Sequence, residues 1–128
     1  YDIPFDENII FIREFSTSGT TELGREIARR NDVTAIFATA DVMAAGIMAG
    51  IHQEGRSVPE DYSIIGFDDI NWCRMTYPML SSVHQDANLK GELAADYMMK
   101  LLEGEPVKSR EIILPVSLSI RNSVMKKK

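Results

Sequence analysis

The sequence is poor in cysteine, since Cys73 is the only one among its 128 residues. A single cysteine excludes an internal disulfide framework and a cysteine-rich zinc site. Long apolar runs are also missing, and none approaches the ~20 residues of a membrane-spanning helix. Positive charge is in deficit, because 14 Lys and Arg face 19 Asp and Glu, for a net charge of −5. Nucleic-acid binding depends on phosphate neutralisation, so this chain by itself is a poor nucleic-acid binder.

The motifs of common catalytic sites are absent as well. The sequence contains no glycine-rich phosphate loop, no His-Glu-x-x-His pair and no Gly-x-Ser-x-Gly turn. His52 and His84 fit no metal-ligand spacing, and Cys73 has no local partner that marks it as an activated nucleophile. We therefore expect no enzymatic activity, no bound metal and no cofactor.

The composition itself is that of one globular domain. Hydrophobic residues make up 45% of the chain and charged residues 26%. A domain of this size buries roughly two thirds of its unfolded surface, which is enough for a core. The chain begins at Tyr1 with neither an initiator Met nor a signal stretch, so we expect a piece of a longer protein. Residues 123–128 are expected to form a short basic tail in solvent.

Apolar runs alternate with helix-period segments along the chain, a pattern typical of βα units and a mainly parallel sheet. The predicted strands are 8–12, 33–38, 63–67, 81–83 and, broken at Pro115, 111–114 and 116–120; the predicted helices are 20–31, 41–54 and 89–103. Asp41 is positioned to cap the second helix, and Gly55 and Gly104 to end the second and third. The expected fold class is α/β, with a mainly parallel sheet flanked by helices.

Polar residues follow three of these predicted strands. They are Arg13 after the first, the stretch 39–41 after the second, and Asp68 with Asp69 after the third. In open α/β sheets, ligands bind outside the carboxyl ends of the strands. A carboxylate there can accept hydrogen bonds from two adjacent hydroxyls of a polyol, and Arg13 can donate to ring oxygens or to an anion.

Trp72 follows Asp69 closely in the sequence, and its ring can stack on the C–H surface of a sugar. Each of these residues also has a purely structural interpretation. Asp41 is more simply a helix cap, Trp72 a packing or interface residue, and Asp69 a loop anchor. Asp68 is the strongest candidate for a ligand carboxylate.

Four segments stand in a characteristic order: TAIFATADVMAAG at 34–46, VPEDYSIIGFDD at 58–69, YPMLSSVHQ at 77–85 and LPVSLSIRNS at 114–123. Together they resemble the LacI/GalR family of bacterial transcription regulators, over nearly the whole chain. The resemblance implies a periplasmic-binding-protein-like effector domain. In that family a helix-turn-helix headpiece and a hinge precede two α/β subdomains, which bind a small molecule, usually a sugar, between them.

By the same resemblance, residues 1–122 correspond to the C-terminal subdomain, which binds effector and dimerises. Residues 85–104 correspond to a segment that crosses to the N-terminal subdomain, which these segments do not include. The implied partners are a small-molecule effector, a second copy in a homodimer, and operator DNA bound only through a headpiece outside this chain. The implied location is the cytoplasm, with no membrane partner.

Individual positions carry the resemblance further. Asp68 matches the family carboxylate that binds effector, Phe37 lies where some members place a pocket aromatic, and Arg13 lies near the family's effector-binding arginine. With Trp72, these residues form the expected effector site. Ala40 stands where many members carry a sugar-binding Asn, and Ala87 where some carry an aromatic, so these two contacts are missing and the effector class is left open.

The resemblance also implies a dimer interface formed by the helix at 41–54 and the loop at 72–78. Its expected contacts are apolar and adaptable: they are Met43, Ile47, Met48, Met75 and Tyr77. Two other interpretations share the predicted fold. One is a sugar-binding protein of a transport system, and the other is a small α/β enzyme that acts on sugars.

Overall fold

A computed structural model describes residues 6–107, 109 and 111–126. The elements of this part of the chain are, in order, η1 (Glu7–Ile9), α1 (Thr17–Ala28), β1 (Ala35–Phe37), α2 (Asp41–Gln53), β2 (Ser63–Asp68), η2 (Asn71–Arg74), β3 (Ser81–His84), α3 (Ala87–Leu102) and β4 (Ser117–Ser119), where η marks a 3-10 helix. The alternation of strands and helices confirms the predicted α/β class.

The strands form one sheet in the order β1-β2-β3-β4. The pairs β1–β2 and β2–β3 are parallel, whereas β4 runs antiparallel to β3. In this register Asp68 pairs with His84, which pairs in turn with Ser117. The carboxyl ends of β2 and β3 and the start of β4 therefore meet at one edge of the sheet, which we call the carboxyl edge.

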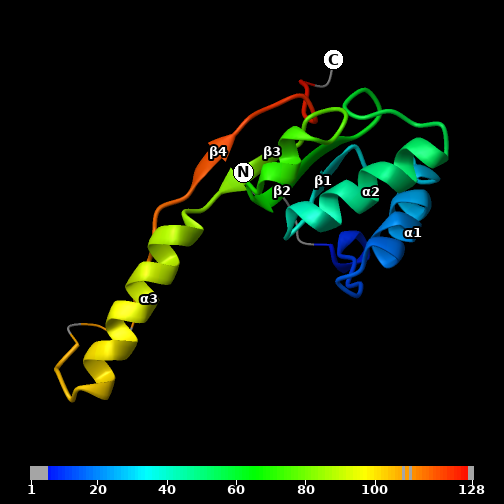
Figure 1. The fold of residues 1–128 in the computed structure, drawn as a ribbon. Helices are drawn as coiled ribbons and strands as arrows, with labels where there is room; N and C mark the ends of the chain where they lie inside the picture. The colour runs from blue at the N-terminus through cyan, green and yellow to red at the C-terminus, as the bar shows by residue number, and fades with distance from the viewer. Residues whose placement is uncertain (1–5, 108, 110, 127–128) are drawn as a thin grey trace.

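Helices α1 and α2 pack against each other on one side of the sheet (Figure 1). Their contact is close because of small residues: a Cβ at Gly24 would lie 2.2 Å from the Ile47 carbonyl oxygen. The core beneath them is apolar and includes Leu23, Ile27, Ile51, Ile64 and Leu80. Both predicted helix stops are confirmed, since Gly55 and Gly104 follow α2 and α3 with φ of 75° and 76°.

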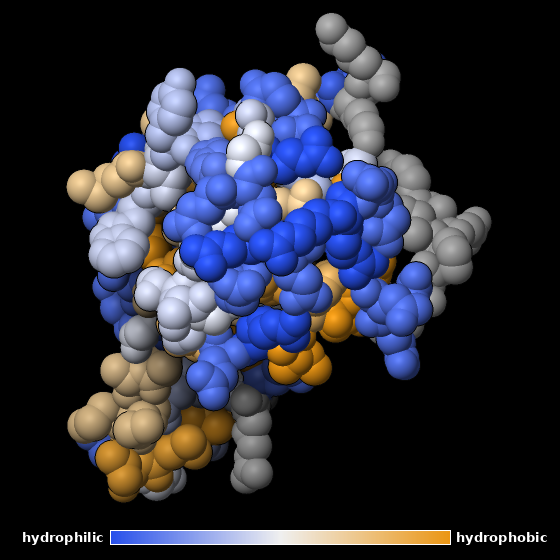
Figure 2. Space-filling model, turned by 90° about the vertical axis from the view of Figure 1, so that its right-hand side faces the viewer, coloured by the Kyte–Doolittle hydropathy of each residue, from blue (hydrophilic) through white to orange (hydrophobic). Residues whose placement is uncertain are grey.

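Helix α3 projects from this body as an arm, and the following chain returns beside it to β4 (Figure 1). None of its residues is buried, and its exposed apolar side chains include Met98, Met99, Leu101 and Leu102. Figure 2 shows the face formed by α1 and α2 as mostly hydrophilic, with hydrophobic side chains gathered below it at the height of the arm. Within the described residues, the arm is thus a helix without a packing partner.

The prediction of a strand at 8–12 is wrong. This segment begins as the 3-10 helix η1 and forms no ladder with β1, which is an edge strand among the described residues. A hollow of about 560 Å³ is lined both by Ile9, Ile10 and Phe11 and by the whole of β1. The apolar run therefore lies near the edge strand β1 but does not pair with it. The stretch 111–114 likewise forms no strand.

Two predictions about single residues are also wrong. Ala40, not Asp41, is the N-cap of α2, and Asp41 is the helix's first residue, buried with its carboxylate directed towards the sheet. The solvated tail does not begin at 123, because Ser123 is fully buried. Its hydroxyl donates to the Ile64 carbonyl oxygen and accepts from the Ser81 amide. The predictions made for residues 1–5 and 127–128 lie outside the described part of the chain.

Candidate functional site

Strand β2 ends in a turn of unusual backbone geometry. Asp68 has a φ of 107° and Asp69 a φ of 56°. Residues other than glycine rarely adopt positive φ, and two in succession are stable only where the surroundings over-determine them. This Asp68–Asp69 turn therefore places two carboxylates at the carboxyl edge and directs them to different partners.

The Asp68 carboxylate is half-buried and faces the start of α3. Its Oδ1 accepts a hydrogen bond from Nε2 of Gln85, and Nζ of Lys90 lies 3.4 Å from the other Gln85 side-chain atom, Oε1. Among the described residues, Oδ2 of Asp68 has no hydrogen-bond partner. An oxygen of this kind is able to accept from a ligand hydroxyl, and a charged acceptor makes a stronger hydrogen bond than a neutral one.

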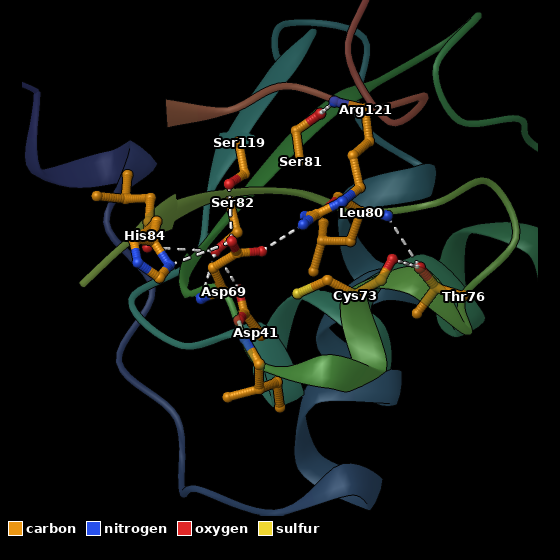
Figure 3. A network of polar contacts seen from close by, with 12 residues as sticks. Asp41, Asp69, Cys73, Thr76, Leu80, Ser81, Ser82, His84, Ser119 and Arg121 are labelled. Carbon is orange, nitrogen blue, oxygen red and sulfur yellow. Dashed lines mark hydrogen bonds and ion pairs between the residues drawn. The ribbon is translucent and has the colours of Figure 1, made fainter. Parts of the chain in front are cut away.

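The Asp69 carboxylate is only 8% exposed and lies inside a polar network, drawn in Figure 3. Oδ1 accepts from Arg121 Nη2 at 2.6 Å, and Oδ2 accepts from Ser119 Oγ at 2.7 Å. His84 Nδ1 lies 3.3 Å from Oδ2. Burial favours a raised pKa for Asp69, but the hydrogen bonds from Ser119 and Arg121 outweigh it, so the pKa lies below its ordinary value. These contacts agree with the interpretation of Asp69 as a loop anchor.

A second part of the network is centred on Asp41. Its Oδ1 accepts from the Ser82 hydroxyl and its Oδ2 from the Ile70 amide at 2.8 Å. The Ser82 hydroxyl oxygen also accepts from the Asp69 amide at 3.1 Å. The adjacent Cys73 thiol is buried, and its burial together with the Asp41 carboxylate raises its pKa to about 12. A thiol with that pKa is no activated nucleophile.

The remaining predicted effector residues are Phe37, Arg13 and Trp72. Phe37, 59% exposed, lines the hollow beside β1, but Asp68, Arg13 and Trp72 do not. Arg13 is instead ion-paired with Glu26 of α1 at 2.8 Å. Trp72 is exposed on η2. The hollow beside β1 therefore contains only one of the four predicted effector residues in its lining.

The predicted interface residues divide into two groups. Ile47 and Met48 are each 3% exposed and belong to the core of the chain itself, so a partner cannot reach them. Met43 packs partly against the same core. Met75 and Tyr77 lie on the loop after η2, and Tyr77, at 92% exposure, also borders a groove of about 670 Å³. The interface prediction therefore depends on the loop rather than on the buried side of α2.

Sequence reasoning missed several residues of the site, namely Ser82, Gln85, Ser119 and Arg121. Ser119 and Arg121 alternate with Leu118 and Ile120, as in a half-exposed edge strand. In that pattern the apolar residues are ordinarily the buried ones, but Leu118 and Ile120 are exposed and Arg121 is 12% exposed at its side chain. The alternation was a usable signal, but the usual pattern of burial would have selected the apolar residues rather than Ser119 and Arg121.

Two features are missing from the described residues. They contain no group of three or more His, Cys, Asp or Glu side chains that could hold a metal ion. None of their helices combines the length and the apolar character needed to cross a bilayer.

Residues 7–124 match the family described as periplasmic binding protein-like domain. A curated relative, the ribose operon repressor of Lactococcus lactis, is 32% identical over 102 residues, which are 80% of this chain and 31% of that protein. The first curated relatives are about three times as long as the part matched, with 35%, 31% and 36% of their lengths covered.

Solved structures of LacI family regulators are also similar to this chain. A LacI family regulator from Enterococcus faecalis with bound ribose has a TM-score of 0.82 at 32% identity, covering 91% of this chain and 43% of that one. A complex of the regulator CelR with cellobiose has a TM-score of 0.86 at 29% identity, covering 94% and 37%. The lac repressor dimer bound to operator has a TM-score of 0.79 at 30% identity, covering 89% and 40%.

Proposed function

The chain belongs to the family of periplasmic binding protein-like domains, and from this premise we propose that it is part of the effector-binding domain of a LacI-type transcriptional regulator. The observation that carries the proposal is the Asp68 carboxylate, which is held at the carboxyl edge with one oxygen unpaired among the described residues. The similarity to regulators with bound ribose and cellobiose supports a sugar or a sugar derivative as effector.

In this proposal the Asp68 carboxylate accepts hydrogen bonds from adjacent hydroxyls of the effector. Gln85 already donates to one carboxylate oxygen, so the ligand either uses the second oxygen or displaces the Gln85 amide. Phe37 offers an exposed aromatic ring on the neighbouring part of the sheet. The opposite wall of the site comes from another part of the complete protein, since the relatives are about three times the matched length.

Effector binding regulates such a protein by stabilising one arrangement of its parts over another. The shift is limited by the difference in effector affinity between the two arrangements. We place operator binding outside this chain, because its net charge of −5 disfavours phosphate contacts. We place the protein in the cytoplasm, where its operator would be, and assign it no catalytic turnover.

We further propose that the protein is a homodimer. The exposed loop side chains Met75 and Tyr77 supply its apolar contacts, with Met43 at the border of the core. The lac repressor, whose fold this chain shares, is a dimer on its operator and supports this arrangement.

The proposal is tested with the complete gene product and DNA from upstream of its own gene. In a fluorescence anisotropy titration, ribose, cellobiose or another sugar of a panel is expected to change the DNA affinity of the wild type. The variant Asp68→Asn should bind DNA as the wild type does, yet need about 10- to 100-fold more sugar, because it loses charge-assisted hydrogen bonds.

The matched control is Glu60→Gln, which neutralises an exposed carboxylate in the turn before β2, away from the carboxyl edge. An unchanged sugar response in Asp68→Asn would remove Asp68 from the site. Sugar binding without any DNA binding would favour a transport protein, and turnover of the sugar that Asp68→Asn abolishes would favour an enzyme.

A further inference from the structure

We propose that Asp41 and Ser82 are positioning residues for effector binding. They hold the Asp68–Asp69 turn in its left-handed conformation and so fix the direction of the Asp68 carboxylate. This inference rests on the proposed function, because it assigns a purpose to the geometry of Asp68. Figure 3 shows the network from which it follows.

The turn needs external support. The φ of 107° at Asp68 lies in a region that residues other than glycine rarely occupy, and Asp69 follows with a φ of 56°. Backbone conformations of this kind persist only where surrounding contacts compensate their cost. The relevant contacts are those that bind the backbone immediately after Asp68.

The network binds the next two backbone amides after Asp68, those of Asp69 and Ile70. The Asp69 amide donates to Ser82 Oγ at 3.1 Å, and the Ile70 amide donates to Asp41 Oδ2 at 2.8 Å. The Ser82 hydroxyl donates its own proton to Asp41 Oδ1, which leaves its oxygen lone pairs for the Asp69 amide. The two amides are thereby fixed by a single buried carboxylate and the hydroxyl bound to it.

The position of the Asp41 carboxylate is itself determined by β2. A Cβ at Gly66 would lie 2.2 Å from Asp41 Oδ1, so glycine at this position leaves the space that the carboxylate occupies. Asp41 comes from the start of α2, Gly66 from β2 and Ser82 from β3. The network thus uses three elements to define one turn.

Neither residue can act on a ligand directly. Asp41 is 2% exposed and Ser82 is fully buried, whereas Asp68 is half-exposed. Their effect on binding must therefore pass through the turn. A general loss of stability would not be confined to the turn. A substitution at the neighbouring position of β3 distinguishes such a loss from an effect on the turn.

Ser81 provides the matched control. Ser81 and Ser82 are consecutive, fully buried residues of β3. The Ser81 hydroxyl accepts from the Arg121 amide beyond β4. The Ser82 hydroxyl donates to the Asp41 carboxylate and accepts from the Asp69 amide. Ser81→Ala and Ser82→Ala each remove one buried hydroxyl, but only Ser82→Ala removes a hydrogen bond to a backbone amide of the turn. Ser82→Thr restores a hydroxyl and serves as the rescue variant.

The test uses the complete gene product, with hydrogen exchange of the Asp69 and Ile70 amides and calorimetric titration with ribose, cellobiose and lactose. Ser82→Ala is expected to accelerate exchange at both amides by about tenfold and to weaken binding of the recognised sugar by about tenfold. Ser81→Ala should lower the melting temperature about as much as Ser82→Ala does, but it should leave amide exchange and sugar affinity unchanged. Ser82→Thr should recover them.

Equal exchange in the two alanine variants would overturn the inference, and so would fast exchange in Ser82→Ala with unaltered sugar affinity. If the wild type binds none of the three sugars, the proposed function loses its support from the relatives. The exchange comparison then still decides whether Asp41 and Ser82 hold the turn, so the two failures are distinguishable.

Discussion

Three aspartates near the carboxyl edge show that the same type of side chain has different roles when its burial and its partners differ. Asp68 keeps one oxygen unpaired among the described residues, which suits a ligand. Asp69 is saturated by Arg121, Ser119 and His84 and joins three strands. Asp41 is enclosed and binds the backbone of the turn. Only the first of these environments leaves a carboxylate for recognition.

The space at Gly66 gives a prediction at this scale. Gly66→Ala would force a Cβ to within 2.2 Å of Asp41 Oδ1, where neither the strand nor the buried carboxylate can yield easily. We expect a loss of about 2 kcal/mol in the free energy of unfolding, measured by urea denaturation.

The control is Gly91→Ala, because nothing lies within 4 Å of a Cβ at this exposed position of α3. That variant should gain about 0.5 to 1 kcal/mol from helix propensity. Equal stability of the Gly66→Ala variant and the wild type would show that Asp41 does not occupy the described position.

The sequence correctly placed Asp68 at the end of a strand, but it predicted the wrong structural role for Asp41. Asp68 directly follows a buried apolar run, so its place at the end of a strand could be deduced. Asp41 stands just before a helical pattern, where a cap is the common role of an aspartate. Its actual partners are Ser82 and the Ile70 amide, 41 and 29 residues away in sequence, and local patterns carry no information about such contacts.

At the scale of elements, all four strands of the described sheet were predicted, including the edge strands β1 and β4. β2 has a neighbour on each side, and its apolar run identified it. The run at 8–12 is also apolar, but it forms no ladder with β1, and its first residues belong to η1, which the Asp6 side chain caps by accepting from the Asn8 amide. For β4, the alternation was evident in the sequence, but the polar residues Ser119 and Arg121 are the less exposed ones, because they bind Asp69.

The joining of β2, β3 and β4 by Asp69 predicts an acid-dependent stability. The pKa of Asp69 in the folded state lies below its ordinary value, owing to the hydrogen bonds from Ser119 and Arg121, which outweigh burial. Its contribution to stability is therefore complete above the unfolded pKa, at about 3.9, and is lost as the pH falls below that value.

Urea denaturation across this range measures the effect. The free energy of unfolding of the wild type should fall more steeply between about pH 5 and about pH 2 than that of Asp69→Asn, which has no carboxyl group to protonate. Ser119→Ala removes one of the two hydrogen bonds and should give an intermediate slope. A slope in Asp69→Asn as steep as in the wild type would contradict the described network.

At the scale of the whole molecule, the described chain consists of a packed α/β body and an unpacked arm. The body contains the core and the carboxyl edge, whereas α3 has no buried residue. A helix of this kind obtains its stability from packing against another surface. We expect that surface elsewhere in the complete protein, on the same side as the opposite wall of the effector site, because Gln85 contacts Asp68 just before α3 begins.

A crystal structure of the complete gene product with its recognised sugar tests the central claim most directly. The claim predicts an Asp68 carboxylate oxygen within about 2.6 to 3.2 Å of a sugar hydroxyl, with the Asp68–Asp69 turn still in its left-handed conformation. A sugar bound elsewhere, with the Asp68 carboxylate in contact only with Gln85, would contradict it.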